Sequence, residues 1–138
     1  MKLTGAWTGA IVYGKMYRNH AGKELVFEMN IVQQDNLFKG ECFDISGTGI
    51  NSDPATIEGT LHENRISFIK QYPTLYYYKN GQTRIDSSKK GKEIKYEGVC
   101  DEDAQVFKGT WRYKNAYRFL WIFKIPSSSG KWEMRKSQ

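Results

Sequence analysis

The chain has few of the residue types from which disulfide, metal and nucleophile sites are built. Among its 138 residues there are two cysteines, Cys42 and Cys100, and two histidines, His20 and His62. Two cysteines are too few for a disulfide framework, so we expect free buried thiols, although a single bridge between them stays open. Both histidines fall in expected turns, away from any nucleophile motif. No His, Cys and carboxylate spacing resembles a metal site, so we expect no metal and no cofactor.

Long apolar runs and helical periodicity are also missing. No apolar run approaches the roughly 18 residues that would span a bilayer, so we expect no membrane partner. The first residues, Met1 to Gly5, contain no apolar signal-peptide core, and no Asn-x-Ser/Thr glycosylation site occurs. We therefore expect a cytoplasmic location. Since no segment keeps a 3.6-residue apolar period with caps, we also expect little or no helix.

What the sequence does contain is alternating apolar and polar residues in short stretches separated by turn residues. With 39% hydrophobic and 14% aromatic residues, the chain can bury a core, and its length matches one domain over 1–138. Short links predict hairpins, and an up-and-down meander closes to remove its edges. We therefore predict an all-β protein, a single antiparallel up-and-down barrel of about 8–10 strands. The expected strands are 5–17, 23–34, 37–46, 54–62, 65–72, 74–80, 92–102, 105–113, 117–125 and 131–135, with longer loops at 46–53 and 81–91.

Four of these strands share one unit, in which a large apolar residue and a glycine stand two positions apart. The units are Phe38-Lys39-Gly40, Ile57-Glu58-Gly59, Tyr96-Glu97-Gly98 and Phe107-Lys108-Gly109. Residues two apart share a face of a strand, so this face is predicted to be the interior. Glycine inside a strand needs a reason. It either relieves crowding where the strand bends or opens space for a ligand.

This rhythm, together with Gly5-Ala6-Trp7 near the start of the first strand, resembles the calycin group of barrels, which includes lipocalins, fatty-acid-binding proteins and avidins. The nearest likeness is avidin-like, carried by Phe107-Lys108-Gly109-Thr110-Trp111. The resemblance implies a barrel with an open end. Gly9 stands where avidins have a biotin-contacting asparagine, so biotin is not implied. The short link from Tyr17 to Lys23 leaves no room for the helix pair of fatty-acid-binding proteins.

Polar residues on the predicted interior face are the candidates for a binding site, because a buried charge is costly unless paired. Asp44 and Lys70 each stand an even number of positions from residues that are predicted to face inward, so they have interior parity, and both lie near strand ends. There they form an ion pair or hold a polar head group, or simply contact water at the barrel mouth. Aromatic residues share this parity. The predicted ligand-binding residues are Tyr13, Asp44, Lys70, Tyr72, Tyr96, Trp111 and Tyr113.

These residues favour non-enzymatic binding of a small, partly apolar ligand in the barrel interior. No catalytic residue is assigned. Two alternatives stay open: a structural or protein-interaction barrel with a filled core, and, with less support, an enzyme that uses Asp44, Lys70 and a tyrosine. An outward pair, Leu120 and Ile122, would suit a subunit contact and homo-oligomer formation.

The net charge of +6 is unevenly distributed, because residues 1–69 carry six basic and eight acidic residues whereas 70–138 carry fifteen and seven. Many of the lysines alternate with apolar residues, as a solvated outer face does. Lysines and arginines do gather in or beside the loop 81–91, next to Tyr76-Tyr77-Tyr78, in a pattern that suits single-stranded nucleic acid. An oligonucleotide-binding barrel normally has five strands, so a nucleic acid partner is disfavoured.

Overall fold

The computed structural model describes residues 2–14, 21–47, 53–103, 105–113 and 129–137, apart from the side chains of 76–78 and 83. These residues form strands and no helix, which confirms the predicted all-β class. Because no helix is present in this part of the chain, none is long and apolar enough to cross a membrane. The strands are β1 (Gly5–Tyr13), β2 (Glu24–Gln34), β3 (Leu37–Gly47), β4 (Ala55–His62), β5 (Arg65–Gln71), β6 (Leu75–Lys79), β7 (Gln82–Asp86), β8 (Ile94–Asp101), β9 (Val106–Tyr113) and β10 (Ser129–Lys136).

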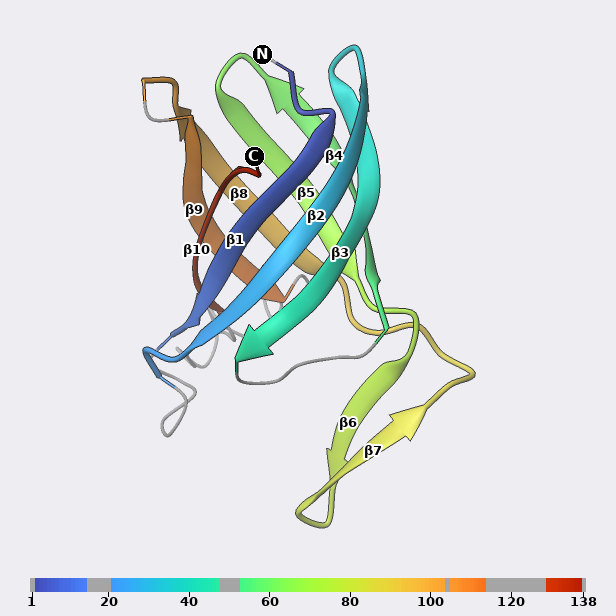
Figure 1. Ribbon diagram of the computed structural model, residues 1–138. Coiled ribbons are helices and arrows are strands. Elements are labelled where there is room, and N and C mark those ends of the chain that lie inside the picture. The colour runs from blue at the N-terminus through green and yellow to red at the C-terminus, as the bar shows by residue number, and fades with distance from the viewer. Residues whose placement is uncertain (1, 15–20, 48–52, 104, 114–128, 138) are drawn as a thin grey trace, which may run out of the picture.

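Eight of the strands form a closed antiparallel up-and-down barrel, as predicted (Figure 1). Their order around the barrel is β1-β10-β9-β8-β5-β4-β3-β2, and β1 pairs with β10 from Trp7↔Lys136 to Tyr13↔Gly130 to close it. Closure leaves no barrel strand with an unpaired edge, so the fold gains the protection from edge pairing that favours barrels over open sheets.

The remaining two strands, β6 and β7, form a hairpin that projects from one end of the barrel (Figure 1). The prediction was wrong in two places here. The strand expected at 74–80 is not part of the barrel meander, and residues 82–86 form a strand rather than a loop. Asn80 and Gly81 turn the chain with φ of 54° and 75°, the positive values of a two-residue type I′ turn. The strand expected at 117–125, with Leu120 and Ile122, lies outside the described residues.

Aromatic side chains fill most of the barrel interior. In the middle, Phe68 stacks on Tyr96 at 4.7 Å between ring centroids and meets the edges of Phe38 and Trp132 at 5.9 and 5.6 Å. Near the end opposite the β6–β7 hairpin, Trp7 contacts Phe107 edge to face at 5.5 Å. Rings at these spacings leave little room between them, so this part of the interior is a packed core.

Both cysteines and the inward glycines belong to this packing. Cys42 and Cys100 are buried free thiols, as expected. A Cβ at Gly9 would lie 2.5 Å from Phe27 Cζ, and one at Gly98 would lie 2.7 Å from Trp132 Cζ2. These glycines therefore make room for neighbouring rings and close backbones. The alternative, that they enlarge a ligand cavity, is contradicted at these positions.

Candidate functional site

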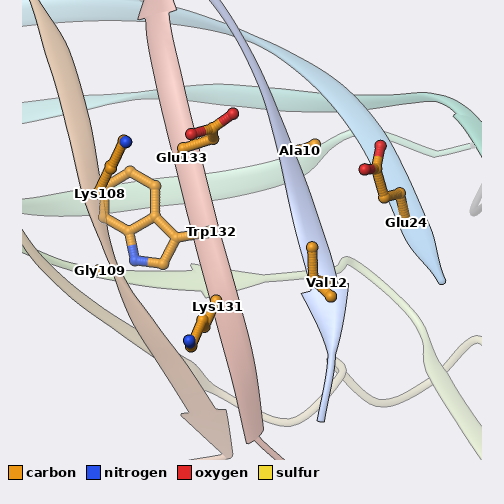
Figure 2. A pocket seen from close by; sticks show the side chains of 8 residues that line it. All are labelled: Ala10, Val12, Glu24, Lys108, Gly109, Lys131, Trp132 and Glu133. Atoms are coloured by element: carbon orange, nitrogen blue, oxygen red, sulfur yellow. The ribbon is translucent and has the colours of Figure 1, made fainter. Parts of the chain in front are cut away.

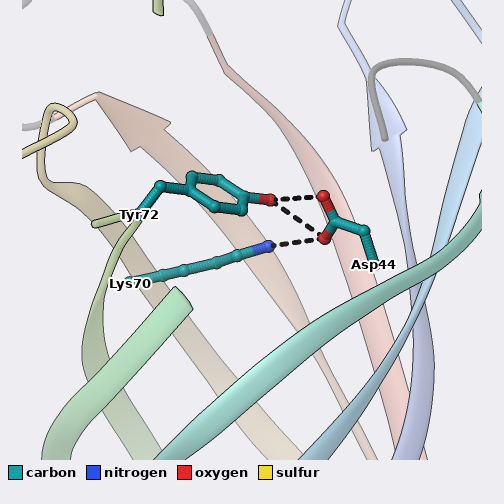
Figure 3. Close-up of polar contacts among 3 residues, drawn as sticks. All are labelled: Asp44, Lys70 and Tyr72. Carbon is teal, nitrogen blue, oxygen red and sulfur yellow. Dashed lines mark hydrogen bonds and ion pairs between the residues drawn. The ribbon is translucent and has the colours of Figure 1, made fainter. Parts of the chain in front are cut away.

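A charged cluster lies inside the barrel at the end from which the β6–β7 hairpin projects. Lys70 Nζ is 3.6 Å from Asp44 Oδ1, and their side chains are 1% and 0% exposed. The Tyr72 hydroxyl donates to the same carboxylate, 2.9 Å from Oδ1 and 2.8 Å from Oδ2 (Figure 3). The predicted ion pair is thus present. The alternative that both residues contact water at the mouth is wrong.

The register of the strands determines which residues lie opposite Asp44 and Lys70. Asp44 lies opposite Phe27, just after the β2–β3 pairing shifts between Val26 and Phe27. Lys70 lies near the end of β5, opposite Ile57 on β4 and Ile94 on β8. An apolar residue on each neighbouring strand therefore flanks a full charge, an arrangement that is stable only while the charge keeps its partner.

Aromatic rings give Lys70 further contacts. Its Nζ lies 4.9 Å from the ring centroid of Tyr72 and 5.9 Å from that of Phe27. Aromatic faces attract cations at such distances. These contacts, with Asp44, compensate the desolvation of the ammonium group.

The protonation states of the cluster follow from burial and charge. Burial lowers the pKa of Lys70, but the neighbouring Tyr96, Cys42, Tyr72 and Asp44 outweigh it, so this pKa is raised and the side chain is an ammonium at neutral pH. Burial raises the pKa values of Tyr72 and Tyr96 far above the usual range, and that of Cys42 as well. Lys70, the phenols and the thiol therefore all keep their protons at neutral pH.

A cavity of about 80 Å³ opens beside this cluster. About 10–15 Å³ of such space holds one water, so the cavity takes a few water-sized groups. Drug-sized ligands occupy roughly 300–1,000 Å³, far more than is present here. The wall contains Ile11, Tyr13, Leu25, Lys70, Tyr72, Ile94, Tyr96, Trp111 and Tyr113.

The cavity brings together the residues that interior parity singled out. All the predicted binding residues line it except Asp44, which is held behind the wall by Lys70 and Tyr72. Trp111 lies at the centre of an aromatic row, 6.0 Å from Tyr13 and 6.3 Å from Tyr113 between ring centroids. The predicted binding role of these residues stays a prediction.

Sequence reasoning missed the apolar part of the wall and the thiol beside it. Alternation along the strands places Ile11 two residues before Tyr13 and Ile94 two residues before Tyr96 on the inward face, and both are buried, as is Leu25. Cys42 also contacts the cluster, because its thiol interacts with Lys70. Nothing in the sequence indicates which interior residues border a cavity, since this depends on how the rings pack.

Other hollows lie on the outer wall, and they include two that are larger than the cavity. The first, of about 300 Å³, crosses β1, β10 and β9, with Ala10 and Val12 on one side and Lys108 and Glu133 on the other (Figure 2). Lys108 and Glu133 are cross-strand partners, so their opposite charges match each other rather than a ligand. The second, of about 430 Å³, lies over β2–β4.

The remaining candidates for chemistry do not form a site. Within the described ranges, no group of three or more His, Cys, Asp or Glu side chains could hold a metal. His62 is exposed at the end of β4, as expected of a turn histidine, whereas His20 lies outside the described residues.

Comparison with known proteins adds no name to this site. No family model matches the chain, and neither a curated protein nor a solved structure matches it. The closed eight-stranded antiparallel barrel is consistent with a calycin-like fold.

Proposed function

We propose that this protein binds a small molecule, or one polar head group of a larger molecule, in the cavity beside Lys70. The observation that carries the proposal is a buried, charged lysine in the wall of a tyrosine-lined cavity. Lys70 lines the cavity, whereas its counter-ion Asp44 does not. A cation facing a cavity without a carboxylate in its wall suits a ligand that brings negative charge or a hydrogen-bond acceptor.

The cavity's size and lining narrow the ligand further. A volume of about 80 Å³ accepts a carboxylate with a short apolar chain and excludes a buried fatty acid or porphyrin. The phenol of Tyr113 stays protonated because burial raises its pKa, so it can donate to an acceptor, whereas the Tyr72 phenol already donates to Asp44. Ile11, Leu25 and Ile94 supply the apolar contact. A short-chain carboxylate or carbonyl compound therefore fits best.

The experiment compares acids with bases of the same shape. Acetate, propionate and butyrate, with propylamine and butylamine as counterparts, are titrated into the protein while tryptophan fluorescence is recorded. Trp111 is in the cavity wall, so occupancy changes its emission. We expect saturable binding of at least one acid and none of the amines. Amine binding, or no saturation by any acid, would contradict the proposal.

Two variants assign the binding to the cavity. Ile94→Phe adds volume inside the cavity, and we expect it to weaken binding at least tenfold. The matched control is Ile69→Phe, the same substitution at a partly exposed position on β5, where Ile69 pairs with Lys95 outside the cavity wall. Tyr113→Phe removes one hydroxyl and keeps the ring, so it tests the hydrogen bond alone. Equal weakening by Ile94→Phe and Ile69→Phe would place the ligand elsewhere.

A specific observation also supports the interaction-module alternative. Val32 and Leu37, beside the hollow over β2–β4, are 61% and 63% exposed. Exposed apolar side chains that cluster mark contact surfaces. Light scattering across a concentration series tests this alternative, because Leu37→Lys should abolish any self-association that the hollow mediates.

A further inference from the structure

The β6–β7 hairpin, Leu75–Asp86, stands apart from the barrel and serves no part of the site described above. Its strands pair with each other, from Leu75↔Asp86 to Lys79↔Gln82, and not with the barrel sheet. It projects away from the lower end of the barrel in Figure 1. An isolated two-stranded hairpin is marginally stable in water. Retaining one outside a closed barrel therefore calls for a contact beyond this fold.

The base of the hairpin is fixed to the barrel. The Gly91 N–H donates to the Tyr72 carbonyl at 2.9 Å, and Gln71 Nε2 donates to the Gly91 carbonyl at 2.8 Å. The chain thus leaves and rejoins the barrel at one point. We call the whole excursion, residues 75–92, the arm.

The arm carries most of the protein's excess positive charge. It has five basic residues and one acidic residue, a net +4, whereas the whole chain has +6. All five cations are exposed, and none of them takes part in a salt bridge of the described residues. They are Lys79, Arg84, Lys89, Lys90 and Lys92. Five cations within 18 residues repel one another, and a polyanion would relieve this repulsion. The arm is therefore electrostatically suited to a polyanion.

We propose that the arm binds double-stranded nucleic acid through its phosphate backbone. A two-stranded β-ribbon fits the major groove of B-form DNA, which is about 12 Å wide. Lysine and arginine neutralise phosphates on both sides of a groove. Barrels that bind oligonucleotides on their wall normally have five strands, which disfavours binding on this eight-stranded wall. The arm lies outside the wall, so the number of barrel strands does not bear on what the arm binds.

An anionic membrane is the competing polyanion, and the described side chains favour it less. Surface binding to lipid combines cations with a continuous apolar face. Of the apolar side chains that the structure describes on β6 and β7, Ile85 is well exposed at 59%, whereas Leu75 is partly covered. One exposed aliphatic residue does not make such a face.

The test measures binding of a fluorescein-labelled 20-base-pair DNA duplex by anisotropy at several salt concentrations. The arm variant carries Arg84→Gln, Lys89→Gln and Lys90→Gln. Its control carries Lys2→Gln, Lys39→Gln and Lys108→Gln, three exposed cations distant from the arm in the sequence, so both variants have the same net charge. We expect the arm variant to lose at least tenfold in affinity and the control less than threefold. Each lost phosphate contact should lower the slope of log K against log salt by about 0.9, so the arm variant should lose up to about 2.7.

A deletion variant keeps the test independent of local unfolding. Residues 75–90 are replaced by Gly-Ser-Gly, which should preserve the barrel because the Tyr72–Gly91 hydrogen bond lies outside the deletion. This variant should keep the barrel's near-ultraviolet circular dichroism and lose duplex binding. Absence of duplex binding by the native protein at 50 mM salt would overturn the proposal. So would equal losses in arm and control variants, or tighter binding to phosphatidylserine vesicles or single-stranded DNA than to the duplex.

Discussion

Replacing Lys70 by methionine should destabilise the protein strongly. Methionine keeps an unbranched side chain, one heavy atom shorter than lysine, and removes the charge. The Asp44 carboxylate, whose side chain is 0% exposed, then loses its cation and stays buried. Removing one partner of a buried ion pair costs about 3–5 kcal/mol, because the charge that remains is uncompensated.

Urea denaturation followed by circular dichroism measures this cost. With an m-value of about 2 kcal/mol/M, a loss of 3–5 kcal/mol lowers the midpoint by about 1.5–2.5 M. The matched control is Lys39→Met on β3, which removes an exposed lysine and should change stability by less than about 1 kcal/mol. Both variants remove one positive charge, so the difference between their losses of stability reports the effect of burying the charge at Lys70.

The double variant Lys70→Met/Asp44→Asn completes the test. Asparagine removes the orphaned charge and still offers an oxygen to the Tyr72 hydroxyl. We expect the double variant to recover most of the stability lost by Lys70→Met, because apolar replacements of buried ion pairs are often near neutral. A Lys70→Met protein as stable as the Lys39→Met protein would refute the buried pair. A double variant no more stable than Lys70→Met would refute the reasoning about the orphaned carboxylate.

Three further outcomes follow from the packing and the pKa directions. Burial raises the pKa values of Cys42, Tyr72 and Tyr96, so at high pH the folded chain keeps protons that the unfolded chain releases; urea midpoints should be constant near pH 7, begin to fall above about pH 8 as the unfolded thiol ionises, and fall further above about pH 10 as the unfolded phenols ionise. A urea midpoint that increases with pH above pH 10 would contradict raised pKa values for these tyrosines. Cys42 is buried with a raised pKa, so a thiol reagent should label it only as fast as the protein unfolds; rapid labelling of the folded protein would show it to be accessible. Gly9→Ala should lower the urea-derived unfolding free energy by more than about 1 kcal/mol, because the new Cβ would clash with the Glu133 carbonyl oxygen and approach Phe27 Cζ to 2.5 Å; an unchanged value would show that both the backbone and the ring can move.

The barrel could be predicted because its signals are local and repeated. Alternation places Trp7, Phe27 and Phe68 on one face of their strands, and the structure buries all three. Short links require each strand to pair with the next. The four units with an apolar residue two positions before a glycine marked the inward face correctly, although only the packing shows that the space at Gly98 is taken by Trp132.

The hairpin was missed for an identifiable reason. Asn80-Gly81 is a strong signal for a two-residue turn, and a turn of this type needs a strand on each side. Gln82–Asp86 lacks an alternating apolar face, so periodicity did not indicate a strand. Its pairing comes from the turn and from β6, not from burial.

The candidate site was predictable as a set of residues and not as a geometry. Interior parity identified Asp44 and Lys70 as charges inside a barrel, which is a property of the pattern. That the two meet at 3.6 Å depends on how β3, β4 and β5 pair, which the residue types alone do not determine. The volume of the cavity depends on how the rings of Tyr13, Trp111 and Tyr113 pack against one another.

We propose that Lys70, buried and charged, lines a cavity that accepts a small acid. Nitrogen-15 spectroscopy of the lysine side chains, with Lys70 assigned by its loss in Lys70→Met, tests this most directly. We expect a Lys70 ammonium signal at neutral pH that is protected from solvent exchange, and that shifts saturably during titration with propionate but not with propylamine. A neutral amine, or a rapidly exchanging ammonium unaffected by the acids that bind, would contradict it.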